Sequence, residues 1–577
     1  MPNTTESVNA EVIAVYPNKV RISVDDLDSF RYAEESLRVG SYLKVSDNEN
    51  VALMCIIESF AIEVREDKDG NTQRLYIIDA FPLGTLKAGK FRRGGDELAI
   101  PPKKVIPATA EEVSSIFRDA FEEEHRFTFS ALTRHRDINV PVHGDKFFNK
   151  HIAVVGATGS GKSHTIATIL QTAISAKATD YKGLNNSHII IFDIHSEYKS
   201  AFPKANVIGV DDLLLPFWLL NAEEMEEIFL ESGDNNNYNQ ASLLRTIVSL
   251  CKERANPGAG KIYFDSPLPY NVQGVVNCLL NLTRETKDAD NDLHVKTKTD
   301  EKTFLTNDEK LQWYCEAPRE FAPTERSKIN RGAYADGSID KFVRRLSSKI
   351  SNPRLQFLFG AKAAELTFEQ VLQQFTGYKK SNEANVTILD LSGIPFEVLS
   401  ITVSLITRIL FDYSYYSRRV SSKCDTPLLL VYEEAHKYAP RSDMARYRAS
   451  LTAIERVAKE GRKYGTSLLI ASQRPSEISE TIFSQCSNFL AMRLTNPDDQ
   501  AYVKRLLPDT LGNLTAGLPS LEAGEALLIG EASVMPGVVY IKPCKPVPSS
   551  GDIPYLKLWK KEWLSVDFTK LAQEWRK

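Results

Sequence analysis

Residues 156–163 read Gly-Ala-Thr-Gly-Ser-Gly-Lys-Ser, which is the pattern G-x-x-x-x-G-K-[ST] of a phosphate-binding loop. Its glycines allow backbone N–H groups to turn inward and approach phosphate oxygens closely. Lys162 can neutralise the β- and γ-phosphates of a nucleotide, and the Ser163 hydroxyl can ligate Mg²⁺. The sequence therefore predicts a site for ATP and Mg²⁺. Its expected contact residues are Gly156, Ala157, Thr158, Gly159, Ser160, Gly161, Lys162, Ser163 and His164.

Two adjacent acids supply the second half of the expected chemistry. Residues 426–436 read Thr-Pro-Leu-Leu-Leu-Val-Tyr-Glu-Glu-Ala-His, an apolar run that ends in a pair of carboxylates. One carboxylate can hold Mg²⁺ and the other can polarise the attacking water. We assign Glu433 to Mg²⁺ and Glu434 to the base, although most enzymes with a phosphate-binding loop carry Asp at the first position. A solvated acidic turn at the end of a strand is the alternative.

Further polar residues follow two other apolar runs. Gln473 comes directly after residues 467–472, where an amide can sense the γ-phosphate or orient water. The alternative is that this amide only satisfies loop backbone. Asp193, His195 and Glu197 lie at and beyond the end of a run at 188–193, and nucleotide sensing, DNA contact and a structural role all stay open for them.

A basic stretch offers candidates for an arginine finger. Residues 454–465 read as the end of a basic helix, and Arg456 or Arg462 can reach the γ-phosphate of a neighbouring subunit. Solvated surface arginines are the alternative. The irregular loop 437–448 mixes basic and aromatic residues, and it fits either a path along a phosphate backbone or an ordinary surface loop.

These residues need a parallel sheet to bring them together. Residues 152–155 read as a buried strand before the phosphate-binding loop, and residues 164–171 as the helix whose N-terminus faces the phosphates. Similar continuous apolar runs are typical of strands that are covered on both faces. The predicted strands of this core are 151–155, 188–193, 386–391, 427–432 and 467–472.

The remaining stretches differ in character from this α/β core. Residues 283–308 are polar and predict a mobile loop inside a helical block. The tail carries three tryptophans among lysines, and it can dock on its own domain or strap onto a neighbouring subunit. The expected organisation is an N-terminal small β-barrel at 1–108, a helical linker at 109–144, the first part of the core at 145–220, a helical insertion at 221–384, the second part of the core at 385–545 and a C-terminal tail at 546–577.

Composition sets broad limits. The chain has 577 residues, a formal net charge of −4 and seven cysteines, so it can form several cores and lacks the basic balance of many nucleic-acid binders. A ring or groove can still concentrate basic residues locally. The cysteines are scattered without a C-x-x-C pair, which disfavours a disulfide framework or a zinc site. No signal peptide or long apolar span is evident, so we expect a cytoplasmic protein without membrane contact.

The motifs together resemble those of the HerA family in the HerA/FtsK superfamily of ring ATPases. The strings that carry the resemblance are VVGATGSGKSHT, IIIFDIHSEY, LLLVYEEAHKYAP and ERVAKEGRKYGTSLLIASQRPSEIS. The match covers residues 145–200 and 385–545, and the β-rich N-terminus looks like the small barrel of such proteins. Residue by residue, the family's lysine falls on Lys162, its acidic pair on Glu433 and Glu434, and its sensor glutamine on Gln473.

The resemblance implies a RecA-like core and a homohexameric ring that moves double-stranded DNA through its channel. It also implies a partner on the barrel, which is a NurA-like nuclease or, in bacterial members with a role in antiphage defence, a sirtuin-like NAD-consuming enzyme or another effector. Two rival functions stay open. One is an assembly scaffold whose ATPase regulates a bound effector without moving DNA. The other, a conjugation or secretion motor, is disfavoured by the lack of an apolar span.

Overall fold

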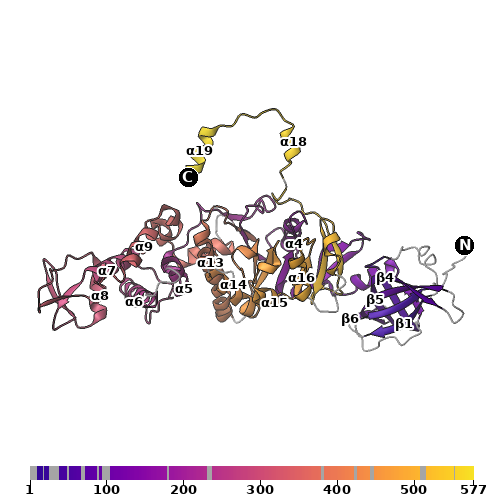
Figure 1. Cartoon of the computed structure of the whole chain (residues 1–577), viewed down its shortest axis with the longest axis horizontal. Coiled ribbons are helices and arrows are strands. Elements are labelled where there is room, and N and C mark those ends of the chain that lie inside the picture. Colours follow the sequence, from indigo (N-terminus) through magenta and orange to yellow (C-terminus); the bar gives the residue numbers. More distant parts are fainter. Residues whose placement is uncertain are drawn as a thin grey trace.

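The computed structural model shows an elongated molecule with the N-terminal barrel at one end, the core in the middle and the insertion at the other end (Figure 1). It describes residues 10–16, 19–24, 38–48, 51–66, 72–87, 90–93, 104–178, 181–230, 237–378, 383–421, 425–441, 448–506, 515–551 and 553–576.

The core is an eleven-stranded sheet with the order β12-β17-β11-β18-β19-β10-β20-β21-β22-β8-β9. Its parallel part consists of β12 (Asn206–Ile208), β17 (Val386–Asp390), β11 (His188–Asp193), β18 (Leu428–Tyr432), β19 (Thr466–Ser472), β10 (Ile152–Val155) and β20 (Asn488–Ala491). The five predicted core strands are confirmed to within one residue at each end. The α/β class and the parallel sheet are confirmed with them.

Helices bury this sheet because parallel strands need crossover connections. α4 (Lys162–Ser175) follows β10, whereas α13 (Phe396–Ser421) and α14 (Ala449–Glu460) pack on each other and precede β18 and β19. α13 is long and apolar enough to cross a membrane between Val398 and Ser421, but 78% of that window is buried inside the protein. Its composition is therefore explained by its place in the core.

The other edge of the sheet is antiparallel. β21 (Glu525–Gly530) and β22 (Gly537–Ile541) form a hairpin, and β8 (Arg126–Leu132) and β9 (Asn139–His143) continue the sheet from it. The prediction of a helical linker at 109–144 is therefore wrong for most of that stretch. Only α2 (Ala110–Arg118), the short 3-10 turn Glu123–His125 and α3 (Gly144–Asn149) are helical there. The strands form because β22, far along the chain, supplies a pairing edge.

The N-terminal unit is a small antiparallel barrel. Its order is β2-β1-β7-β3-β4-β5-β6, and an additional β2–β5 pairing closes the ring. The strands are β1 (Ala10–Tyr16), β2 (Lys19–Val24), β3 (Tyr42–Asn48), β4 (Val51–Glu66), β5 (Thr72–Lys87), β6 (Lys90–Arg93) and β7 (Lys104–Pro107). Met54, Ile56 and Leu83 extend the main hydrophobic core from the large sheet into this barrel. The predicted β-rich unit is confirmed.

The insertion is mostly helical, with one difference from the prediction. Its helices are α5 (Ala222–Phe229), α6 (Asn237–Ala255), α7 (Val272–Arg284), α8 (Asn307–Glu316), α9 (Asp340–Ile350), α10 (Gln356–Phe359), α11 (Ala361–Ala364) and α12 (Phe368–Thr376). The prediction of a mobile loop at 283–308 is wrong. Antiparallel pairing orders that stretch into a small sheet of β13 (Thr286–Asp288), β14 (His294–Lys296), β15 (Glu301–Thr303) and β16 (Ile329–Arg331).

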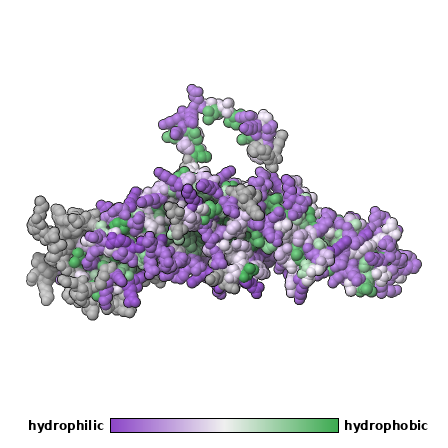
Figure 2. Space-filling model, turned by 180° about the vertical axis from the view of Figure 1, so that it is seen from behind, coloured by the Kyte–Doolittle hydropathy of each residue, from purple (hydrophilic) through white to green (hydrophobic). Residues whose placement is uncertain are grey.

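The segment that leads into the C-terminal tail is bound to the core, whereas residues 553–576, here called the free arm, stand off the body. Thr168 and Gln171 of α4 donate hydrogen bonds to the carbonyls of Lys542 and Pro546 in that segment. Beyond it, α18 (Tyr555–Trp559) and α19 (Phe568–Arg576) stand off the body (Figures 1 and 2). Residues 553–573 and Trp575 are all exposed. Of the two alternatives for the tail, docking on its own domain is absent from this structure.

Candidate active site

The phosphate-binding loop has the backbone that its glycines predict. Gly159 and Gly161 have φ of 74° and 95°, a region that L side chains rarely adopt. At Gly156 a Cβ atom would lie 2.6 Å from Ser160 Oγ and 2.9 Å from Met492 Cβ, so a side chain there would collide with the loop and with the end of β20. The sharp turn therefore depends on glycine at these positions.

Neighbouring strands hold the loop while leaving its inner donors open. The N–H of Gly156 donates to the Ser472 carbonyl (3.2 Å), and that of Ala157 donates to the Arg493 carbonyl (2.8 Å). Within the part of the chain that the structure describes, no acceptor is found for the N–H groups of Gly161, Lys162 and Ser163. Open donors at the start of α4 are what phosphate oxygens require. Residues 156–163 thus form a turn whose inner donors can face phosphate oxygens, and the contacts of residues 156–164 with a nucleotide stay a prediction.

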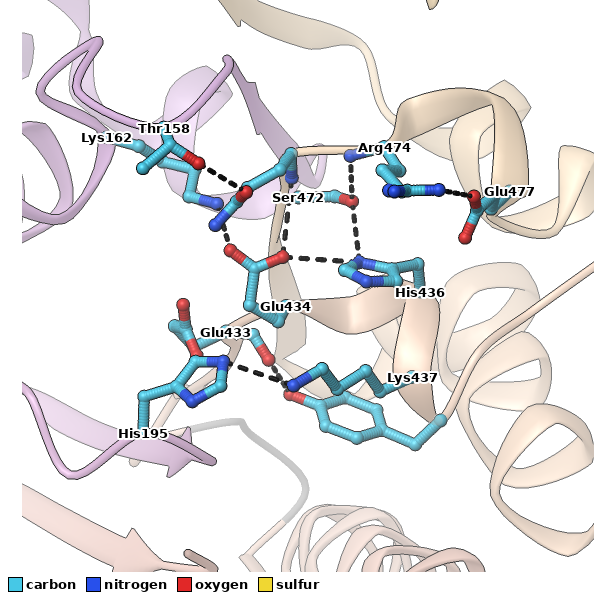
Figure 3. A network of polar contacts seen from close by, with 12 residues as sticks. Thr158, Lys162, His195, Glu433, Glu434, His436, Lys437, Ser472, Arg474 and Glu477 are labelled. Atoms are coloured by element: carbon cyan, nitrogen blue, oxygen red, sulfur yellow. Dashed lines mark hydrogen bonds and ion pairs between the residues drawn. The ribbon is translucent and has the colours of Figure 1, made fainter.

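Glu434 lies at the centre of the polar network in Figure 3. One carboxylate oxygen accepts a hydrogen bond from the Lys162 ammonium, and the other lies 3.2 Å from His436 Nδ1. Burial alone would raise the pKa of Glu434, but the charges of Lys162 and then His436 hold it below its usual value. Its backbone is left-handed, with φ of 47°. The predicted base is therefore ionised and paired with the predicted phosphate-binding lysine.

The pKa of Glu433 is shifted in the opposite direction to that of Glu434. Burial, followed by the charge of Glu434, raises the pKa of Glu433 to about 9 despite the opposing Lys162. Its Oε2 atom is buried without a hydrogen-bond partner. An orphaned, buried carboxylate oxygen is a donor atom that a hard cation such as Mg²⁺ prefers. Glu433 therefore fits the predicted Mg²⁺ ion, whose positive charge would replace the proton of the carboxyl group.

A third carboxylate lies on the other side of the loop. Ser163 Oγ donates a hydrogen bond to Glu197 Oε2 at 2.8 Å. Asp193 is oriented differently, because its carboxylate accepts the backbone N–H groups of His195, Glu197 and Tyr198. Asp193 thus orders the loop 193–198. His195 Nε2 lies 3.1 Å from the ammonium of Lys437, which places that histidine at the rim of the network (Figure 3).

Gln473 contacts the phosphate-binding loop directly. The side-chain oxygen of Gln473 accepts a hydrogen bond from the Thr158 hydroxyl at 2.8 Å. The backbone nitrogen of Gln473 lies 3.5 Å from Glu434 Oε2. Behind it, Ser472 Oγ lies 3.1 Å from His436 Nδ1 and accepts the Arg474 N–H at 2.9 Å. Side-chain contacts therefore link the residues at and after the carboxyl ends of β10, β18 and β19.

The two candidate arginine fingers lie away from this site. Arg456 sits over the Phe411 ring, 4.7 Å from its centroid, and faces Asp412 and Glu460. Arg462 lies in the 3-10 turn Gly461–Tyr464 before β19, at the amino end of the strands. The phosphate-binding loop is at their carboxyl end. Neither arginine reaches the loop of its own chain.

Three side chains at the site have contacts that the sequence does not predict. His436 bridges Glu434 and Ser472, and Glu197 holds Ser163. Arg493 Nη2 donates to the Gly159 carbonyl at 3.3 Å. The signal for Arg493 is its position two residues after a strand that pairs with β10, but β20 has only four residues and no clear pattern in the sequence.

The loop after β10 and the acidic pair after β18 define an NTPase of the P-loop class. Residues 127–410 match the family model described as "Helicase HerA, central domain". With relatives along most of its length, the chain is a helicase-like ATPase that is similar to HerA helicases.

A probable helicase of Methanocaldococcus jannaschii is 23% identical over 97% of this chain and 96% of its own length. The DNA double-strand break repair helicase HerA of Saccharolobus solfataricus is 24% identical over 80% of this chain and 77% of its own. The solved plasmid coupling protein TrwB with the ATP analogue ADPNP is 13% identical, with a TM-score of 0.44 over 77% of this chain and 94% of its own.

The raised pKa of Glu433 predicts a pH-dependent stability without nucleotide and metal. The folded protein keeps this proton up to about pH 9, whereas the unfolded chain releases it near the ordinary glutamate value of about 4.3. Stability should therefore fall as pH rises through this window, because the unfolded state binds fewer protons there. Glu433→Gln mimics the protonated carboxyl and should lack this loss.

The measurement is thermal unfolding of both proteins between pH 6 and 9. The melting temperature of Glu433→Gln should exceed that of the wild type by a margin that grows with pH. Glu531→Gln, which removes a carboxyl paired with Lys150 away from the site, is the control and should follow the wild type. A margin that stays constant across the pH range would contradict the assignment of the buried proton to Glu433.

Proposed function

We propose that the chain forms a homohexameric ring in which ATP hydrolysis between subunits moves double-stranded DNA. One observation carries the proposal. The phosphate-binding loop, the candidate metal ligand and the candidate base lie together in one chain, whereas both candidate arginine fingers of that chain lie away from the site. A neighbouring subunit would supply a positively charged arginine side chain to the γ-phosphate, from its Arg456 or its Arg462. The repair helicase of Saccharolobus solfataricus named above supports DNA as the substrate.

The contact between Lys162 and Glu434 suggests how hydrolysis is held in check. Lys162 and Glu434 neutralise each other, so the base is occupied until phosphate oxygens compete for the lysine. When bound, ATP would supply the phosphoanhydride and the phosphate oxygens that compete with Glu434 for Lys162, and Mg²⁺ would supply positive charge beside those phosphates. Glu434 then accepts a proton from a water molecule, Ser163 and Glu433 hold the metal, and Gln473 senses the γ-phosphate beside Thr158.

The barrel is the proposed docking site for a partner enzyme. A NurA-like nuclease suits a role in DNA processing, and a sirtuin-like or other effector suits antiphage defence in a bacterial host. A cytoplasmic location without membrane contact agrees with both. The second candidate function is an assembly scaffold whose turnover regulates the partner.

We expect Glu434→Gln to bind ATP but to hydrolyse it at least about 100-fold more slowly, because the amide keeps the shape and loses the base. Lys162→Ala should lose hydrolysis through weakened binding of the phosphates. Steady-state turnover and binding of a fluorescent ATP analogue separate the two effects. If Glu433→Gln alone binds without turnover while Glu434→Gln stays active, the two acids have exchanged roles.

Stimulation by linear double-stranded DNA discriminates translocation from scaffolding. We expect DNA to raise turnover, and we expect a triple substitution of Arg441, Arg446 and Arg448 by Ala to abolish this rise while preserving basal turnover. Residues 442–447 lie outside the described residues. Turnover that ignores DNA and changes only with the partner would favour the scaffold. Unchanged stimulation in the triple variant would remove this loop from the DNA path.

The free arm predicts a contact between subunits. Trp563 is 98% exposed and Trp575 86%, whereas apolar side chains of this size are normally covered. We expect truncation after residue 550 to raise the concentration needed for ring assembly by at least about tenfold, because each lost aromatic anchor costs about 2 kcal/mol. Native mass spectrometry measures the assembly. A truncated chain that assembles normally would show that the arm covers something else.

A further inference from the structure

Glu197 is the one carboxylate of the site that touches the phosphate-binding loop through Ser163. The serine hydroxyl donates to Glu197 Oε2 at 2.8 Å. Ser163 lies in the first turn of α4, and Glu197 follows β11, which is separated from β10 in the sheet by β18 and β19. The contact therefore closes the site on the side opposite to Arg493.

The backbone around Glu197 is fixed by contacts that do not involve its side chain. The Asp193 carboxylate accepts the N–H of Glu197 at 3.1 Å, and the Glu197 carbonyl accepts the N–H of Ser549 at 2.8 Å. The preceding Ser196 is left-handed with φ of 57° and donates its hydroxyl to Asp390 at 2.8 Å. A change confined to the carboxylate of Glu197 should therefore leave the loop in place.

Glu197 also acts electrically on the predicted metal ligand. Its charge is among those that raise the pKa of Glu433, after burial and the charge of Glu434. Tyr198, the next residue, carries a buried hydroxyl without a hydrogen-bond partner. Glu197 therefore contacts Ser163 directly and also influences Glu433, whose buried Oε2 atom has no hydrogen-bond partner among the described residues.

We propose that Glu197 is a positioning residue for the divalent cation, acting through the hydroxyl of Ser163. A hydroxyl has one proton and two acceptor lone pairs. When the proton points at Glu197, the lone pairs are directed away from that carboxylate and are free for the cation. The carboxylate accepts a charge-assisted hydrogen bond that holds the hydroxyl in this orientation. The proposal rests on the proposed ATPase site and adds the residue that sets its metal affinity.

The test measures binding of Mn²⁺, an oxygen-preferring substitute for Mg²⁺ that is visible by electron paramagnetic resonance, in the presence of ADPNP. We expect Glu197→Gln to raise the dissociation constant of Mn²⁺ about tenfold, with ADPNP binding in the absence of metal unchanged. Glu197→Asp keeps the charge and should recover part of the affinity. Glu531→Gln removes a distant carboxylate and should bind Mn²⁺ as the wild type does.

A double-mutant cycle separates this role from a general field effect. In a Ser163→Ala background, Glu197→Gln should change the Mn²⁺ dissociation constant less than about twofold, because the route through the hydroxyl is gone. A tenfold loss that persists in that background, or wild-type affinity in Glu197→Gln alone, would overturn the proposal. Failure of the wild type to bind ADPNP at all would instead refute the nucleotide site itself.

Discussion

Two adjacent buried carboxylates are the constraint to which the rest of the site responds. Glu433 and Glu434 are each 2% exposed, and two neighbouring negative charges cannot both persist in such an environment without compensation. The protein meets this requirement in two different ways. Lys162 neutralises Glu434, while Glu433 retains its proton. The pair is therefore asymmetric in the folded chain, although the two residues are chemically identical.

This asymmetry is possible because parallel strands end at one edge. Glu434 follows β18, Gln473 follows β19 and Lys162 follows the turn after β10, and these strands are neighbours in the sheet. The backbone of each strand is buried and hydrogen-bonded on both sides, so the edge is a rigid support for short side-chain contacts. His436 and Ser472 add a second layer behind Glu434.

The sequence predicts the chemistry better than the connections between its parts. Continuous apolar runs reveal strands that are buried on both faces, and they place Lys162, Glu434 and Gln473 at one edge. β8 escapes prediction because its partner β22 lies about 400 residues away, as the pairing of Leu132 with Val539 shows. The contacts of Glu197 and Arg493 also escape prediction, because they depend on the order of the strands in the sheet. Sequence patterns report burial, whereas strand order is a property of the whole fold.

The antiparallel strands β21, β22, β8 and β9 give the sheet a mechanical role. They extend the hydrogen-bonded ladder from β10 and β20 towards the barrel without a break. The barrel is joined to this end by shared core residues such as Met54 and by the hydrogen bond from Arg93 to the Gly530 carbonyl. Close-packed interiors have low compressibility and transmit strain. The loop after β10 and the barrel are therefore connected through one continuous, closely packed sheet, and the barrel is packed against the end of that sheet.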